Sequence, residues 1–484
     1  MSEWSFLTWS PDDAAAAVYD VTVDGAWEQL VDFYAGETPS APLERIVTLA
    51  REHGVRSLVV EQRHLDADWR SEHAAFHGRL FRRHPSVTHR WHLFTDDVDP
   101  ADLTRLDPAA YRGHAVMRPL PATPVGRTMI TPPPGLDGGV RCEATERLSL
   151  FGTPLEVRAM PFLSQDAEYL RCAHATLWMV LRHAHLAHGL PRQLTSAVHD
   201  AALGGVIVGR QVPSEGLSVQ QMMSGATTLG LSPGLVHLPT RAENDEAGML
   251  TLGGILCRYV NSQAPPIVIS RAHAWVVVGY RRVSPESGSG VRLWRHDDAR
   301  GPYLEVADPF DEVDDAHRPW QAAILPLLPQ VYVTAERAEA AGEHWFRGYV
   351  SQADPDEPIA TADLTWRTYV TRADEWLEHL SSRGVDPELA RLYRLTPMPE
   401  YVWVVEAVDR AARADGRPDV VGEAILDSTA STHHEPLLSG LIALHGGRLA
   451  HRIGPDHAQR REIRIDAPGH YITGRRGSPR PGAG

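Results

Sequence analysis

A cysteine and a histidine, far apart in the sequence, have the surroundings of a nucleophile and its base. Cys172 precedes an apolar run, residues 173–181, that contains no helix breaker, so we expect it at a helix N-terminus. The unpaired N–H groups and the dipole at that end favour a thiolate, the form of cysteine that attacks carbonyl carbon. His273 precedes the β-branched run 276–278, which predicts a buried strand that orients the imidazole. The pair predicts acyl chemistry through a thioester.

A catalytic histidine also needs a partner on its second ring nitrogen, which fixes the tautomer and stabilises the imidazolium. A Ser/Gly-rich turn and a returning strand, residues 291–296, follow the strand of His273. A hairpin folded about that turn would bring the next acids back beside the histidine. Asp297 is the first choice, Asp298 is its neighbour, and Asp308 lies one strand further on.

Gln165 lies on the polar loop that leads into Cys172. Its side-chain amide can donate a hydrogen bond to the oxyanion that develops when a thiolate attacks a carbonyl group. We therefore expect Gln165 to complete the site as an oxyanion donor.

The order of these residues resembles a known family. Gln165, Cys172 with its helix, the segment HAWVVVGY at 273–280 and the segment DDARG at 297–301 look like the papain-like cysteine peptidase superfamily. The likeness is greatest to the bacterial branch that includes the double-glycine leader peptidases of bacteriocin exporters. It covers about residues 155–335.

This resemblance implies a papain-like central domain, in which a helix carries the cysteine and an antiparallel sheet carries the histidine and the acid. It also implies a role for each residue. Cys172 would be the nucleophile, His273 the general base and acid, Asp297 the orienting acid and Gln165 the oxyanion donor.

A non-catalytic interpretation competes with this one. A lone cysteine in an apolar helix is usually a buried small hydrophobe, and a lone strand histidine is usually a core residue. The ordered set favours catalysis, while a binding module whose catalytic residues have become structural is the alternative of another class. Cys142 and Cys257 have no such surroundings, and Cys257 is typical of a core thiol. Three cysteines without paired spacing are typical of a reducing compartment.

All 47 basic residues are arginine, and the sequence contains no lysine. High-GC genomes favour arginine codons, yet lysine is normally among the commonest residues. Acyl-transfer and ubiquitin-like tagging systems modify the lysine amine, and arginine cannot replace it chemically. We hypothesise selection against self-modification, which fits a hydrolase beside a conjugating system or an enzyme that passes acyl groups to amines.

Length and charge limit the remaining possibilities. A chain of 484 residues suggests about three domains. Its formal net charge of −15 argues against nucleic acid or an anionic membrane as the main ligand, because phosphate neutralisation needs a basic face. The sequence has neither a basic-then-apolar leader nor an eighteen-residue apolar stretch. We expect a cytoplasmic protein with a peptide or protein substrate.

We expect an α+β protein in which modules flank the hydrolase. The expected segments are an N-terminal α/β domain (1–118), a Pro/Gly-rich linker or arm (119–150), the papain-like hydrolase (151–350), a mainly β module (351–473) and a disordered tail (474–484). The outer modules would select a substrate, bind a partner protein or sense a signal.

Four polar residues in the N-terminal segment, Glu61, His64, Asp66 and Asp68, invite a metal interpretation. Their spacing matches no known ligand frame, so we expect a capped, solvated helix start, and no metal or cofactor.

The chain as a whole predicts a papain-like cysteine hydrolase, a protease or isopeptidase that cuts an amide bond through a Cys172 acyl-enzyme. A defence or protein-tagging setting would suit the missing lysines. Transfer of the acyl group to an amine, as in transglutaminases, is the chemical alternative, because the same triad supports it when water is excluded.

Overall fold

The computed structural model describes residues 16–204, 214, 216–246, 251–283, 290–313, 319–353, 364–382, 387–409, 420–430, 440–444, 449–453 and 461–464. Within them the chain is a mixed α+β protein with eleven α-helices and four β-sheets. It divides into two compact units, one of residues 1–241 and 263–326 and the other of residues 242–262 and 327–484. No helix in the described ranges is long and apolar enough to cross a membrane.

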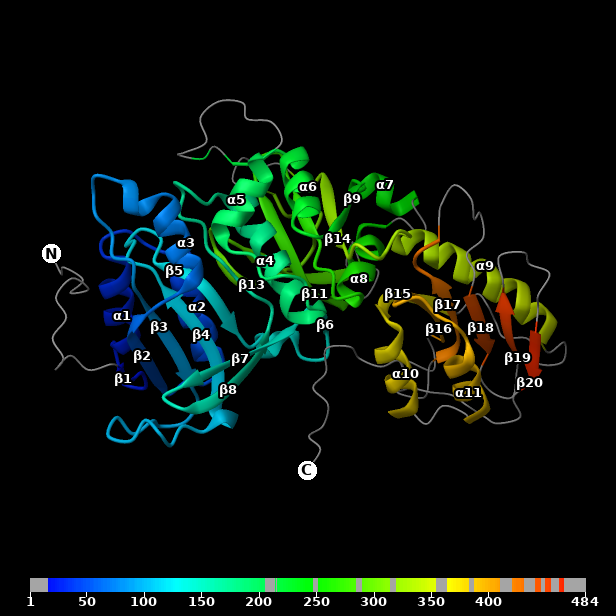
Figure 1. The fold of residues 1–484 in the computed structure, drawn as a ribbon, viewed down its shortest axis with the longest axis horizontal. Coiled ribbons are helices and arrows are strands. Elements are labelled where there is room, and N and C mark those ends of the chain that lie inside the picture. The colour runs from blue at the N-terminus through cyan, green and yellow to red at the C-terminus, as the bar shows by residue number, and fades with distance from the viewer. Residues whose placement is uncertain are drawn as a thin grey trace. The chain divides into compact units, whose positions relative to one another are not determined.

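The first unit begins with a five-stranded antiparallel sheet in the order β1-β2-β3-β4-β5, drawn in blue and cyan in Figure 1. Trp27 and Tyr34 of the first helix pack on Trp91 of the third strand. The elements of this layer are β1 (Ala16–Asp20), α1 (Ala26–Ala35), α2 (Ala41–Glu52), β2 (Ser57–His64), α3 (Ala67–Ala75), a 3₁₀ turn at His77–Arg79, β3 (Thr88–Phe94), a 3₁₀ turn at Pro108–Ala110, β4 (Tyr111–Met117) and β5 (Val125–Ile130).

A two-stranded hairpin covers the opposite face of that sheet. Its strands are β7 (Ala144–Leu150) and β8 (Thr153–Ala159). Leu155 and Val157 of the hairpin share one hydrophobic core with Val59 and Met129 of the sheet. Because apolar side chains line both faces, the sheet lies inside the first unit.

The second layer of this unit is a seven-stranded sheet in the order β13-β12-β11-β10-β14-β9, with β6 paired to β11. Residues 274–280 of β11 are all buried, as the continuous apolar run predicts. Helix α4 packs against this strand, and α5 and α6 pack against α4. The elements are a 3₁₀ turn at Pro134–Leu136, β6 (Val140–Arg141), α4 (Cys172–His188), α5 (Thr195–Leu203), α6 (Val219–Thr228), β9 (Ser232–His237), β10 (Ile267–Ile269), β11 (Ala274–Arg282), β12 (Val291–Asp297), β13 (Gly301–Val306) and β14 (Ala322–Leu327).

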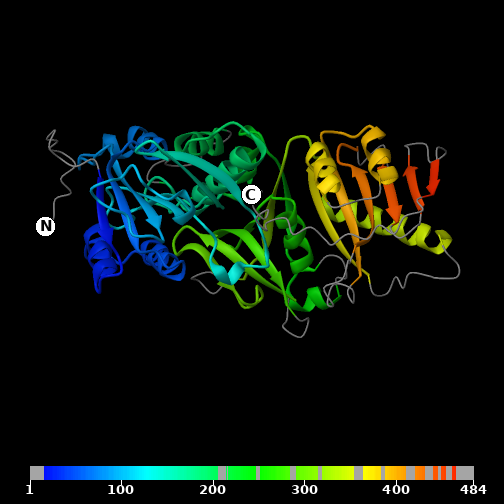
Figure 2. The same ribbon diagram turned by 90° about the horizontal axis from the view of Figure 1, so that it is seen from below.

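The second unit is built on a six-stranded antiparallel sheet, β15 to β20 in chain order. Alternating residues of β16 face opposite ways: Val404 packs with Trp376 of α10, and Val405 contacts Gly342 of α9. Figure 2 shows α9 on one face of the sheet and α10 with α11 on the other. The elements are α7 (Arg241–Glu246), which starts at the unit boundary, α8 (Leu252–Asn261), α9 (Ala335–Ala353), β15 (Leu364–Arg372), α10 (Ala373–Ser382), α11 (Pro387–Leu395), β16 (Tyr401–Asp409), β17 (Val420–Asp427), β18 (Gly440–Leu444), β19 (Leu449–Ile453) and β20 (Arg461–Arg464).

The boundaries of the two units differ from the boundaries of the segments that the sequence predicts. The expected boundaries near residues 118 and 150 fall inside the first unit, and residues 242–262 belong to the second. Residues 119–150 also contribute strands instead of only a linker, because the run VGRTMI between two prolines forms the fully buried β5. The tail expected at 474–484 lies outside the described residues.

Helix α3 ends at Ala75, and His77 lies in the 3₁₀ turn that follows. Asp66 caps this helix as expected, since its side chain accepts a hydrogen bond from the backbone N–H of Trp69 at 2.9 Å. The expectation of a solvated helix start was wrong. Asp66 and Asp68 are buried, because the cations Arg127 and Arg192 pair with them.

Candidate active site

Cys172 is the first residue of α4, as its sequence surroundings predict. Arg171 before it is extended, and the first helical hydrogen bond runs from Ala175 N–H to the Arg171 carbonyl at 3.1 Å. The N–H of a residue at this position has no partner within the helix. Cys172 is half-buried, whereas Cys142 and Cys257 are buried, so Cys172 is the thiol that a reagent in solution can reach most easily.

His273 lies immediately before β11, in a turn that Ser270 closes. The N–H of His273 donates to Ser270 Oγ at 3.1 Å, and the Ser270 N–H donates to the His273 carbonyl at 2.9 Å. The imidazole stands edge-on to the ring of Trp275, with centroids 5.1 Å apart. Its side chain is 20% exposed, so the ring is held in place but still meets solvent.

Asp297, at the end of β12, is the acid nearest to His273. His273 Nε2 lies 3.2 Å from Asp297 Oδ1, and Trp275 Nε1–H donates to Oδ2 at 2.8 Å. The N–H of Ala299 also donates to Oδ1 at 3.0 Å. Burial by itself would raise the pKa of Asp297, but the hydrogen bond and charge of His273 and the charge of Arg295 hold that pKa below its usual value.

Asp298 is a second carboxyl group at the same imidazole. Its Oδ1 lies 3.6 Å from His273 Nε2, its side chain is fully buried, and neither carboxylate oxygen has a hydrogen-bond partner among the described residues. Burial raises its pKa to about 7; the charge of His273 opposes this rise and that of Asp297 adds to it. Near neutral pH this carboxyl therefore gains or loses a proton readily.

The two acids and the cysteine together determine the charge of His273. Burial lowers the pKa of an imidazole, yet hydrogen bonds with Asp297 and Cys172, together with the charges of both aspartates, outweigh burial and raise the pKa of His273 to about 10. The ring is therefore an imidazolium at neutral pH. Because Nε2 faces the carboxylates, Nδ1 is the ring nitrogen left for the thiol.

The backbone of Gln165 is firmly held, but the structure does not join its side chain to the pair. Arg118 Nη2 donates to the carbonyl oxygens of Ser164 at 3.2 Å and of Gln165 at 3.1 Å. Ser164 Oγ donates to the carbonyl of Asp298 at 2.8 Å, which links the loop to the end of β12. Among the described residues the Gln165 side chain forms no hydrogen bond with Cys172 or His273.

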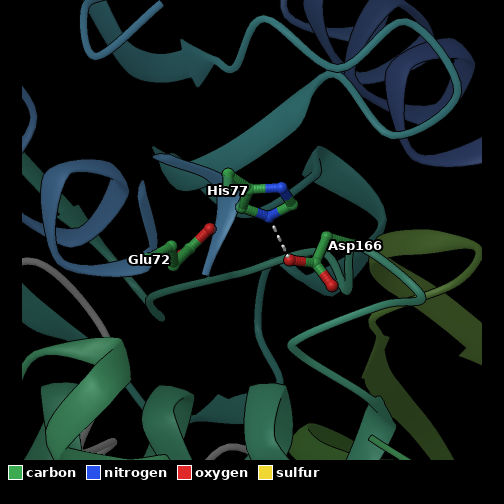
Figure 3. A group of neighbouring side chains, drawn as sticks. All are labelled: Glu72, His77 and Asp166. Carbon is green, nitrogen blue, oxygen red and sulfur yellow. Dashed lines mark hydrogen bonds and ion pairs between the residues drawn. The ribbon is translucent and has the colours of Figure 1, made fainter. Parts of the chain in front are cut away.

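Two groups of acids and histidine have the donor atoms of a metal site: His273 with Asp297 and Asp298, and Glu72 with His77 and Asp166 (Figure 3). In the second group one atom of each side chain is already engaged, while Glu72 Oε1 and His77 Nδ1 have no hydrogen-bond partner among the described residues. His77 Nε2 donates to Asp166 Oδ2 at 2.9 Å, and Arg118 Nη1 donates to Glu72 Oε2 at 3.2 Å. A guanidinium beside the carboxylates opposes a second cation there, so this group fits a hydrogen-bonded network better than a metal centre.

The remaining candidates from the sequence separate clearly. Asp308, the third possible orienting acid, instead pairs with Arg241 at 3.3 Å. Trp275, which sequence reasoning missed as a support for Asp297, lies two residues after His273, and this is the spacing that puts two strand side chains on one face.

A scan against protein-family models and a search of curated proteins found no match to this chain.

Proposed function

We propose that the protein is a cysteine hydrolase that cleaves a peptide or isopeptide bond through an acyl-enzyme on Cys172. The observation that carries the proposal is the contact of His273 with Cys172 on one side and Asp297 on the other. An imidazolium beside a thiol at a helix N-terminus favours the thiolate. The chain order of Cys, His and Asp, with the thiol at the start of a helix, the imidazole just before a strand and the acid at the end of the next strand, also supports the papain-like interpretation.

The reaction follows from these positions. The Cys172 thiolate attacks the carbonyl carbon, and the proton on His273 passes to the leaving amine as the C–N bond breaks. His273, now neutral, takes a proton from water as the water attacks the thioester. The acid is released, the thiolate leaves as the C–S bond breaks, and the imidazolium is restored. Asp297 holds the ring and stabilises its charge throughout.

The absence of lysine favours a second candidate, transfer of the acyl group to an amine. A lysine-free enzyme offers an acyl-enzyme no side-chain amine of its own. Both reactions share the Cys172 thioester and differ only in the acceptor. Adding glycine methyl ester to the acylated protein separates them, because a transferase gives the amide and a hydrolase gives the free acid.

The first test is alkylation by iodoacetamide at about pH 6, with the labelled cysteine identified by mass spectrometry. Cys142 and Cys257, both buried, are controls within the same chain. We expect fast labelling at Cys172 in the wild type and a loss of about tenfold or more in His273→Ala. Slow labelling of Cys172 that does not depend on His273 would contradict the proposal and favour a non-catalytic binding module.

A further inference from the structure

The loop between Gln165 and Cys172 is folded around one buried carboxylate, Asp166. Its Oδ1 accepts hydrogen bonds from three consecutive backbone N–H groups, those of Glu168 at 2.9 Å and of Tyr169 and Leu170 at 2.7 Å each. The N–H groups of Asp166 and Ala167 both donate to the Leu170 carbonyl at 3.2 Å. The carboxylate therefore fixes a tight turn whose two ends carry Gln165 and the start of the helix of Cys172.

Residues from the N-terminal layer fix that turn from outside. His77 Nε2 reaches the second oxygen of Asp166 at 2.9 Å, with both side chains buried, and Figure 3 shows the imidazole directed at the carboxylate. The ring of Trp69 lies against His77, with centroids 5.1 Å apart. Arg118 donates hydrogen bonds to the Glu72 carboxylate and to the backbone carbonyl of Gln165. The segment is thus held by its own backbone, by His77 and by Arg118.

Closing this turn requires a strained backbone conformation, which indicates that the loop has one defined shape. Ala167 has φ +64, in the left-handed region that residues with a Cβ rarely adopt. The Asp166 carboxylate offsets this strain with its three N–H bonds. Burial alone would raise the pKa of Asp166, but the hydrogen bond from His77 and the charge of Arg118 keep it below its usual value, so the group stays a charged acceptor at neutral pH.

We propose that Asp166 and His77 are positioning residues that hold the 165–171 loop, so that the backbone N–H of Cys172 and the amide of Gln165 meet the oxyanion of the reacting carbonyl. This inference rests on the proposed function, because it needs an acyl-enzyme to form on Cys172. Neither residue touches the substrate. They act by fixing where the donors stand, and oxyanion stabilisation is sensitive to such positions.

Two reagents that attack the same sulfur separate positioning from thiol activation. With iodoacetamide the Sγ–CH₂ bond forms and iodide leaves, and no oxyanion develops. With p-nitrophenyl acetate the Sγ bond to the acetyl carbon forms, the bond to p-nitrophenolate breaks and the carbonyl oxygen becomes an oxyanion on the way. The ratio of the acylation rate to the alkylation rate at Cys172 therefore reports the oxyanion donors alone.

We expect Asp166→Ala to alkylate at close to the wild-type rate while its acylation rate falls by about tenfold to a hundredfold, somewhat less than the loss of an oxyanion donor outright. His77→Ala should lower the same ratio by about threefold to tenfold, because the three backbone bonds of Asp166 remain. Asp166→Asn keeps an acceptor oxygen for those bonds and should retain a ratio within about threefold of the wild type. Asp308→Ala is the matched control. It removes a carboxylate that accepts a hydrogen bond from the Phe310 N–H in another loop, and it should leave the ratio unchanged.

The outcomes separate the two proposals. A wild-type protein that p-nitrophenyl acetate does not acylate at Cys172 would overturn the proposed function and this inference with it. Acylation of the wild type with an unchanged ratio in Asp166→Ala and His77→Ala would overturn the inference alone, as would an equal fall in both rates. Should Asp166→Ala fail to fold, a lower ratio in His77→Ala than in Asp166→Asn carries the same test. Hydrogen exchange at the amides of 168–170 should be faster in His77→Ala, and unchanged exchange would contradict the role of His77.

Discussion

Replacing Asp297 by asparagine should narrow the pH range in which His273 is an imidazolium beside Cys172. The difference between the usual pKa of histidine, 6.5, and the value of about 10 for His273 corresponds to about 5 kcal/mol in favour of the imidazolium. The hydrogen bond with Asp297 is the largest of the contributions that raise this pKa. A hydrogen bond to a charged group contributes about 1.5–3 kcal/mol, so Asp297 supplies about half of the effect.

Without that charge, the pKa of His273 should fall to about 8–9. Above that pH the ring is neutral and no longer stabilises a thiolate on Cys172. The range in which His273 is charged should therefore shrink from its alkaline end. At about pH 9.5 the fraction of His273 present as imidazolium should fall by about threefold or more, whereas at pH 6 the ring stays charged in both proteins.

The assay is the second-order rate of iodoacetamide labelling at Cys172 between pH 5 and 10, measured by mass spectrometry. Asp308→Asn is the matched control, because Asp308 pairs with Arg241 instead, and its profile should match the wild type. A profile of unchanged width in Asp297→Asn would refute this reasoning. If Asp298→Asn alone narrowed the profile, the orienting acid would be Asp298, which lies 3.6 Å from Nε2.

Two further predictions concern the free energy of unfolding. The folded-state pKa of Asp298, about 7, lies above its ordinary value of 3.8, so its protonation stabilises the folded protein below pH 3.8, and this stability is lost as the pH rises through 7. When urea unfolding is measured at pH 5 and at pH 8, the free energy of unfolding of the wild type should fall by about 2–3 kcal/mol more than that of Asp298→Asn. An equal fall in both proteins would contradict the raised pKa of Asp298. Asp66→Ala should lower the free energy of unfolding by about 3 kcal/mol, since it removes one partner of the buried Arg127, which keeps Glu146 at 2.7 Å, as well as the cap on Trp69 N–H. Asp66→Asn should recover about 1 kcal/mol by restoring the cap. An asparagine variant no more stable than the alanine one would argue against capping.

The hairpin that brings the acids to His273 could be predicted from the sequence. A β-branched run and a short returning run joined by a Ser/Gly-rich turn leave few alternatives, and the observed register sets Val276 opposite His296. Asp297 was the first choice from the sequence, but that Asp298 would reach the same imidazole could not be predicted. Neighbouring strand residues normally face opposite ways, but the pairing of β12 with β13 shifts between Arg295 and Asp297, and this irregularity lets Asp297 and Asp298 both approach one ring.

No pattern in the sequence indicates which residues hold the Gln165 loop. Asp166 and His77 meet across 89 positions, and no local pattern relates them. Such contacts depend on how α3 and the turn after it lie against the loop, which periodicity cannot reveal. The strand β5 was missed for a different reason, since prolines and glycines surround a short run that is apolar only in part, and burial against the hairpin decides its structure.

The hydrogen bond from Arg118 to the Gln165 carbonyl means that the peptidase-like segment depends on residues outside it. The segment that resembles a peptidase covers about residues 155–335, yet Glu72, His77 and Arg118, which hold the 165–171 loop, all precede it. Excising that segment, or fusing it to another protein, would carry the nucleophile without its scaffold. Recombination that separates the N-terminal layer from Cys172 should therefore leave a thiol whose neighbouring loop is no longer held in place.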